Sequence, residues 1–85
     1  QLLYRKQVTI KEPHWIINSP SKFQSIKVLA RIRQVGELLP AKLSYNKKSK
    51  HFEVELKKAI TGVSEGQAIV LYQKEKVLGG GVISS

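Results

Sequence analysis

The side chains that enzymes use most often for nucleophilic and acid–base chemistry are scarce in this 85-residue chain. It has two histidines, His14 and His51, and no cysteine. Nucleophilic catalysis needs a nucleophile, a base and a group that orients the base, and the residue spacing suggests no such set. The lack of cysteine also excludes disulfides and thiolate metal ligands. We therefore expect no catalytic residue in this chain.

Two motifs could carry other chemistry, and each has a plainer interpretation. His51, Glu53 and Glu55 would share one face of a strand, but a metal ion needs three or four convergent ligands, and such spacing is more often a solvated face. The glycines at 79–81 suggest a phosphate loop, yet no Gly-Lys-Ser/Thr and no helix start follows them. We interpret them as a bend or close approach in a strand, and we expect neither a metal nor a cofactor.

Charge is the strongest functional signal of the sequence. Fifteen lysines and arginines stand against six acidic residues, all glutamate, which gives a formal net charge of +9. This balance favours RNA, DNA or an anionic membrane surface as partners, and for so small a domain we expect nucleic acid. The alternative is a basic surface that serves solubility. Because no segment reaches transmembrane length and no signal peptide is seen, we expect a cytoplasmic protein without a membrane partner.

The cations with the clearest placement lie on predicted strands. Residues 26–33 alternate, with aliphatic residues on one face and three cations on the other, where neighbouring positions are about 7 Å apart. Residues 40–45 alternate in the same way and point one lysine outward. Ordinary surface charge is the alternative for each of these cations. We predict that four side chains bind RNA phosphates: Lys27, Arg31, Arg33 and Lys42.

These strands belong to a predicted series of hairpins. Residues 40–45 and 51–56 flank a polar turn, and the apolar runs 68–72 and 77–83 flank a four-residue connection that suits a type I turn. A short strand at 3–10 precedes a mostly loop segment at 11–24. Six or so short strands predict a small antiparallel β-barrel. We divide the single domain into an N-terminal extended segment and loop at 1–25 and the barrel at 26–85.

Three apolar residues do not fit a simple barrel. Trp15 lies in the predicted loop, where it could close the barrel mouth or pin the loop, and stacking on a base is the less favoured alternative. Ile69 and Leu71 lie on the face of their strand opposite to Ala68, Val70 and Tyr72. We expect this to be the solvent side, so residues 1–25 or another domain should cover both side chains. Ile69 and Leu71 are therefore our predicted domain-docking residues.

The assembled motifs resemble the C-terminal domain of the tRNA-specific 2-thiouridylases. In that family a Gly-Gln pair opens a strand that ends in an aromatic residue, and Leu-Gly-Gly-Gly follows in the next strand. Here these motifs are residues 66–72 and 78–83, and a loop tryptophan and a basic strand match Trp15 and Arg31. The resemblance extends in order over essentially the whole chain. Its structural motif residues here are Trp15, Gly66, Gln67, Gly79, Gly80 and Gly81.

The resemblance implies a six-stranded antiparallel barrel similar to a barrel domain of elongation factor Tu. It also implies a parent enzyme that 2-thiolates the wobble uridine of tRNA, using ATP and a persulfide sulfur donor, with its chemistry in an N-terminal domain. This chain would then be a C-terminal fragment that engages tRNA and docks on the N-terminal and central domains.

The sequence departs from the family pattern in two places. Many relatives have Arg-Tyr-Arg-Gln in the basic strand, where residues 33–36 read Arg-Gln-Val-Gly, so one cation is missing. Many also have a glycine in the last hairpin, where Lys74 and Glu75 stand, which predicts a longer type I loop. Two other classes stay open: an RNA-binding barrel of a translation factor or ribosomal protein, and a protein-docking barrel with incidental charge.

Overall fold

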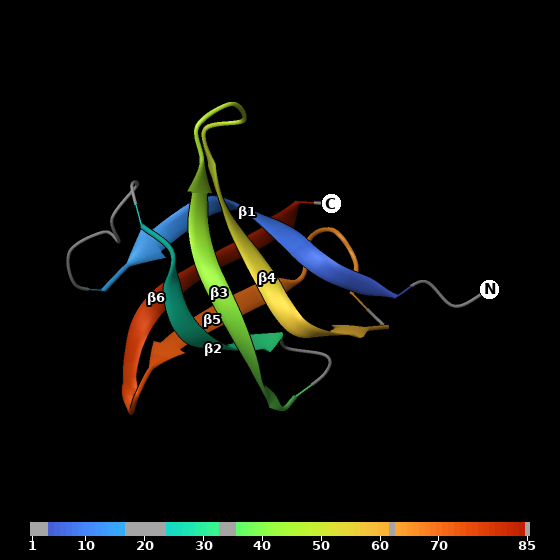
Figure 1. Ribbon diagram of the computed structural model, residues 1–85, viewed down its shortest axis with the longest axis vertical. Coiled ribbons are helices and arrows are strands. Elements are labelled where there is room, and N and C mark those ends of the chain that lie inside the picture. The colour runs from blue at the N-terminus through green and yellow to red at the C-terminus, as the bar shows by residue number, and fades with distance from the viewer. Residues whose placement is uncertain (1–3, 17–23, 33–35, 62, 85) are drawn as a thin grey trace.

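The computed structural model describes residues 4–16, 24–32, 36–61 and 63–84 as one closed antiparallel barrel, with no helix in these residues. The strand order around the barrel is β1-β4-β3-β2-β5-β6 (Figure 1). This confirms the predicted all-β fold. The six strands are β1 (Arg5–Trp15), β2 (Ile26–Ile32), β3 (Leu38–Asn46), β4 (His51–Ile60), β5 (Ala68–Gln73) and β6 (Lys76–Ser84).

Strand β1 closes the barrel by pairing with a different strand on each side. Its first part pairs with β4 up to Ile10 opposite Phe52, and its later part pairs with β6 as far as Trp15 opposite Gly79. The register with β6 shifts between Lys11 and His14, and this irregular stretch contains Pro13. A bulge is one of the few places where a strand accepts proline. The loop expected from residue 11 onward is therefore wrong for residues 11–15, and this part of the N-terminal segment belongs to the barrel wall.

The barrel interior holds the apolar sets predicted from alternation in β2, β3 and β4. Each of these strands places every second side chain inward, and the core contains no buried polar residue among those described. At one end of the core, the rings of Trp15 and Tyr45 pack edge-on against Phe52, with centroid distances of 5.1 and 5.0 Å. The buried core residues are Val8, Ile10, Val28, Ala30, Ile32, Ala41, Leu43, Phe52, Val54, Leu56, Ile69, Leu71 and Ile83.

Strand β5 faces the opposite way from our prediction. Ile69 and Leu71 are 1% and 0% exposed and lie in the core. They stand opposite Ile32 and Ala30 of β2, whose side chains also point inward, so pairing fixes the orientation. A run of consecutive aliphatic residues has no alternation that could reveal this orientation. The outward placement was wrong, and neither residue is available to dock another domain.

The three glycines of β6 lie where its neighbours approach most closely. A Cβ at Gly79 would meet the His14 carbonyl oxygen and Trp15, and a Cβ at Gly80 would meet the Ile69 carbonyl oxygen. A Cβ at Gly81 would lie 2.5 Å from Cγ2 of Ile10. Because this segment of β6 has no side chains, the backbones of β1 and β5 can lie close to it on either side.

The Gly66-Gln67 pair joins the preceding connection to the end of β6. Gly66 has a φ of 92°, which favours glycine. Its amide donates to the Ile83 carbonyl oxygen (2.8 Å), and the Ile83 amide donates to the Gln67 carbonyl oxygen (2.9 Å). The Gln67 Oε1 accepts a further bond from the Ser64 amide (3.0 Å). The pair therefore anchors residues 64–67 on the barrel.

The turn between β5 and β6 is tighter than predicted. Gln73 pairs with Lys76, so only Lys74 and Glu75 connect the strands. Lys74 has a φ of 56°, the left-handed conformation that two-residue hairpin turns require. The expectation of a longer type I loop was wrong, because a lysine adopts the conformation for which we expected glycine.

Candidate nucleic-acid interface

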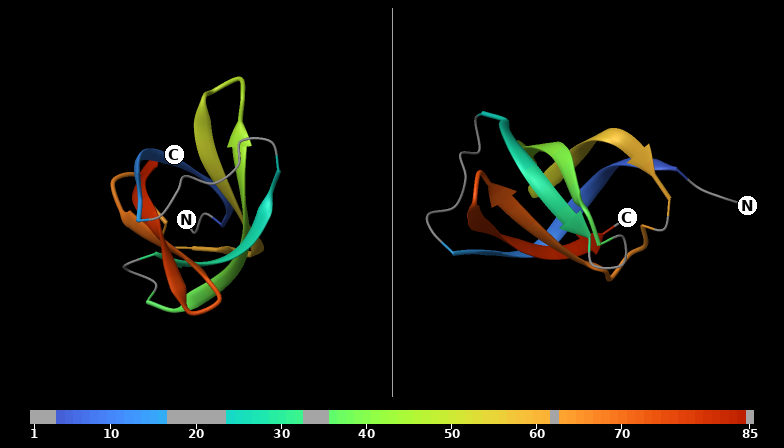
Figure 2. Two further views of the ribbon diagram at one scale, coloured as in Figure 1. Left: turned by 90° about the vertical axis from the view of Figure 1, so that its left-hand side faces the viewer. Right: turned by 90° about the horizontal axis from the view of Figure 1, so that it is seen from below.

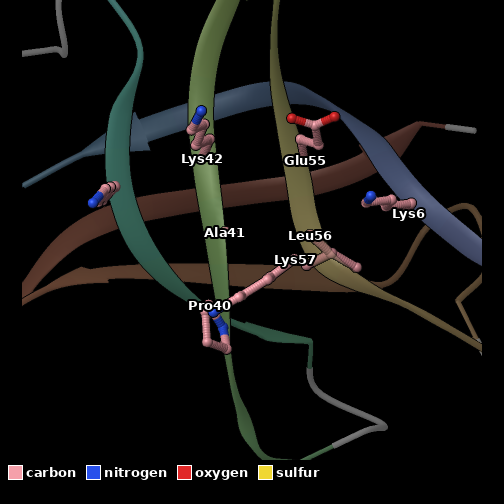
Figure 3. A pocket seen from close by; sticks show the side chains of 8 residues that line it. Lys6, Pro40, Ala41, Lys42, Glu55, Leu56 and Lys57 are labelled. Carbon is pink, nitrogen blue, oxygen red and sulfur yellow. The ribbon is translucent and has the colours of Figure 1, made fainter.

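Four adjacent strands each contribute one lysine to a hollow on the outer wall of the barrel. The hollow has a volume of about 450 Å³, and its floor includes Pro40, Ala41 and Leu56. Figure 3 shows it from close by, with Lys42 and Glu55 on neighbouring strands. We name it the four-lysine hollow after Lys6 of β1, Lys27 of β2, Lys42 of β3 and Lys57 of β4.

Strand register places like charges side by side in this hollow. Lys27 of β2 stands directly opposite Lys42 of β3, and Lys42 stands opposite Glu55 of β4. Like charges directly opposite each other destabilise a sheet, whereas opposite charges stabilise it. Among the described residues that line the hollow, Glu55 is the only carboxylate, against four ammonium groups. The hollow is therefore suited to an anion that would relieve the repulsion between its lysines.

The predicted RNA-binding residues are only partly brought together. Lys27 and Lys42 are exposed neighbours in the hollow. Arg31 is exposed on the same face of β2, four residues from Lys27 and so about 13 Å along the strand. Its guanidinium carbon lies 5.9 Å from the centroid of the Tyr72 ring, within the range of a cation–π contact. Arg33 lies outside the described residues.

Sequence reasoning missed two lysines of the hollow. Lys57 continues the outward positions of Glu53 and Glu55, because β4 runs on to Ile60. Extending the alternation by one step would have found it. Lys6 had no such signal, since it lies at an irregularity in the β1–β4 register between Arg5 and Gln7. Only the pairing of β1 with β4 brings it to this surface.

Two polar residues of the β3–β4 hairpin, Glu53 and Asn46, have structural partners. The Glu53 carboxylate accepts hydrogen bonds from Nε2 of Gln7 (2.7 Å) and from Nδ2 of Asn46 (3.1 Å). Glu53 therefore joins the hairpin to β1. Across the part of the chain that the structure describes, no group of three or more His, Cys, Asp or Glu side chains could hold a metal ion.

Trp15 lies at the end of β1 rather than in a loop. Its side chain is partly buried against the core, edge-on to Phe52 and close to Gly79. These contacts support the structural role over base stacking. In the described residues, no helix is long and apolar enough to cross a membrane.

A closed six-stranded barrel with one basic wall is a small β-barrel module, and comparison with known families places it more closely. A family model described as the aminomethyltransferase β-barrel domain matches residues 5–83. The chain belongs to this family.

The relatives it matches are tRNA-modifying enzymes by name. The chain is 35% identical over 86 residues to the tRNA-specific 2-thiouridylase MnmA of Methylorubrum populi. The aligned region covers 95% of this chain and 22% of that protein. It is 42% identical over 86 residues to the protein of the same name from Paracoccus denitrificans, and this alignment covers 99% of the chain and 22% of that protein. The chain thus spans about a fifth of the length of these curated relatives, and it is homologous to their barrel domain.

Proposed function

We propose that this chain is the C-terminal, tRNA-engaging barrel of an enzyme that 2-thiolates the wobble uridine of tRNA. The four-lysine hollow is the observation that carries the tRNA-engaging role, because it gathers cations from four strands around one carboxylate. The names of the relatives support tRNA as the nucleic acid. ATP and a persulfide donor would serve the N-terminal catalytic domain of the parent enzyme, whose other domains are the expected protein partners.

The physical role of the hollow is to hold phosphates. Lysine ammonium groups are point charges that bind phosphate without reading bases, so the hollow would position tRNA while base recognition occurs elsewhere. A closed sheet fixes the Cα positions of all four lysines before RNA arrives, which lowers the ordering cost of binding. Arg31 extends the same basic wall along β2 and is a further phosphate contact.

A salt titration of tRNA binding tests this proposal. The purified chain should bind tRNA with a Kd of roughly 10⁻⁴–10⁻⁶ M and lose affinity steeply as salt rises. Lys27→Gln together with Lys42→Gln should weaken binding and flatten the slope of log K against log salt by about one to two units. The matched control is Lys74→Asn with Lys76→Gln, which removes equal charge from the β5–β6 turn, with asparagine chosen because it tolerates the left-handed conformation.

The same titration separates the proposal from its alternatives. Identical slopes for wild type and the Lys27/Lys42 variant would show that this wall faces away from tRNA. No tRNA binding at any salt concentration would favour a protein-docking barrel with incidental charge. A barrel from a translation factor or ribosomal protein would bind tRNA in the same way, because phosphate contacts read no bases. The full open reading frame separates this alternative, since the proposal requires an N-terminal catalytic domain in the same protein. Adding Arg31→Gln to the Lys27→Gln/Lys42→Gln variant should lower the slope of log K against log salt by up to one further unit.

A further inference from the structure

The β3–β4 hairpin extends beyond its neighbouring strands. The two strands stay paired as far as Asn46 opposite His51. Strand β2 pairs with β3 only as far as Leu43, and β1 pairs with β4 only as far as Phe52. Within the described residues, positions 46–51 are therefore paired only with each other and form a two-stranded projection, which extends from the barrel in two views (Figures 1 and 2). Neither the four-lysine hollow nor the core accounts for this projection.

The tip of this projection is basic and polar. Residues 47–50 form the turn, read Lys-Lys-Ser-Lys, and are all exposed, as is His51. We call residues 47–50 the hairpin tip. The exposed large apolar side chains of the described residues are Tyr4, Ile16, Leu38 and Val77, none of them in the tip. A protein interface needs apolar area at its centre, and a membrane-inserting tip needs apolar side chains. Because the hairpin tip has three lysines and no large apolar side chain, it suits a phosphate backbone.

A single asparagine holds the hairpin tip in shape. The Asn46 Oδ1 accepts hydrogen bonds from the amides of Lys48 (2.9 Å) and Ser49 (3.2 Å), and the Asn46 carbonyl oxygen accepts from the Lys50 amide (2.7 Å). The Asn46 Nδ2 donates to Glu53, which Gln7 also binds. The turn backbone is therefore ordered before any partner arrives, so that binding would not have to fold it.

We propose that the hairpin tip is a second RNA-phosphate contact, separate from the four-lysine hollow and used by the same RNA molecule. This rests on the proposed function for its ligand. Lys42 and the first tip residue are five positions apart on one hairpin, or about 16 Å. Two contacts at that spacing can be occupied by one folded RNA, and the second then forms at a high effective concentration. The hairpin would thereby orient the RNA across the barrel wall as well as hold it.

A second set of charge variants tests the hairpin tip. Lys47→Gln with Lys48→Gln removes two charges and leaves Asn46 and the left-handed Lys50 (φ 61°) unchanged. We expect the salt slope of tRNA binding to fall by about one to two units. The Lys74→Asn/Lys76→Gln control on the other turn should keep the wild-type slope. Combining the tip and hollow variants should lower the slope by the sum of the two separate changes.

Directed cleavage then shows where the hairpin tip lies on the RNA. Since the chain has no cysteine, Ser49→Cys provides a single thiol for an iron chelate that cleaves nearby RNA. Ser49 contributes only its backbone amide to the turn bonds found. We expect cuts confined to one stretch of tRNA from position 49, and none from the control Glu75→Cys on the β5–β6 turn.

The outcomes separate this inference from the proposed function. If the tip variant keeps the wild-type slope while the hollow variant does not, the inference is overturned and the proposed function stands. If the salt slope of tRNA binding falls in the tip variant and stays at the wild-type value in the hollow variant, the tip contacts RNA and the hollow does not. Diffuse or absent cleavage from position 49 with wild-type affinity overturns the inference. A wild-type chain that binds no tRNA overturns both.

Discussion

Gly80 shows how a single position fixes the spacing of two strands, β5 and β6. Replacing it with alanine would drive a methyl group into the carbonyl oxygen of Ile69, a backbone atom held by strand pairing between β5 and β6. We expect Gly80→Ala to lower the free energy of unfolding by roughly 3 kcal/mol, since the contact can be relieved only by moving a strand. Denaturant unfolding followed by the fluorescence of the single tryptophan measures the change.

Gly36→Ala is the control for Gly80→Ala. Apart from its chain neighbours, no described residue has an atom within 4 Å of a Cβ placed at Gly36, but its φ of 84° disfavours any L residue, so we expect a loss of about 1 kcal/mol. Equal losses at the two positions would contradict the close-approach explanation.

The three consecutive glycines of β6 correctly predicted a bend or a close approach, because a strand has few other uses for consecutive glycines.

At the scale of elements, Asn46 contributes three side-chain hydrogen bonds to the β3–β4 hairpin. We expect Asn46→Ala to lower the free energy of unfolding by about 1–2 kcal/mol, because it removes two bonds to turn amides and one to Glu53. The amides of Lys48 and Ser49 should exchange hydrogen faster. Asn46→Asp keeps an acceptor for those amides but loses the donor to Glu53, so it should preserve their protection. Unchanged exchange in the alanine variant would show that the tip is ordered by other contacts.

Elements differ in how readily their sequence reveals their orientation. Residues 41–45 of β3 and 51–57 of β4 alternate between apolar and polar residues, and β2 does so except at Leu29, so the inward and outward residues could be predicted. Strand β5 contains Ile69, Val70 and Leu71 in succession, and only pairing with β2 decides which of them face inward. In β1, Pro13 suggested a loop, whereas a shift in register lets the strand continue. Tertiary pairing overrides local signals where those signals are ambiguous.

At the scale of the whole molecule, barrel closure makes the candidate site. Lys27 and Lys42 could be found because each lies on an alternating strand, but the register that sets them opposite each other could not be read from the sequence. Lys6 and Lys57 lie far apart in the sequence, and the pairing of β1 with β4 brings them to one wall. The hollow is therefore a property of the fold, and its four charges come from four separate segments.

We expect the purified 85-residue chain to form no thiolated product from tRNA, ATP and a persulfide donor. A persulfide route needs a cysteine to carry sulfur, and the chain has none. Mass spectrometry of nucleosides from the treated tRNA measures 2-thiouridine directly. A full-length 2-thiouridylase in parallel confirms that the substrates are competent, so that 2-thiouridine formed by the barrel alone would refute the assignment of the chemistry to another domain.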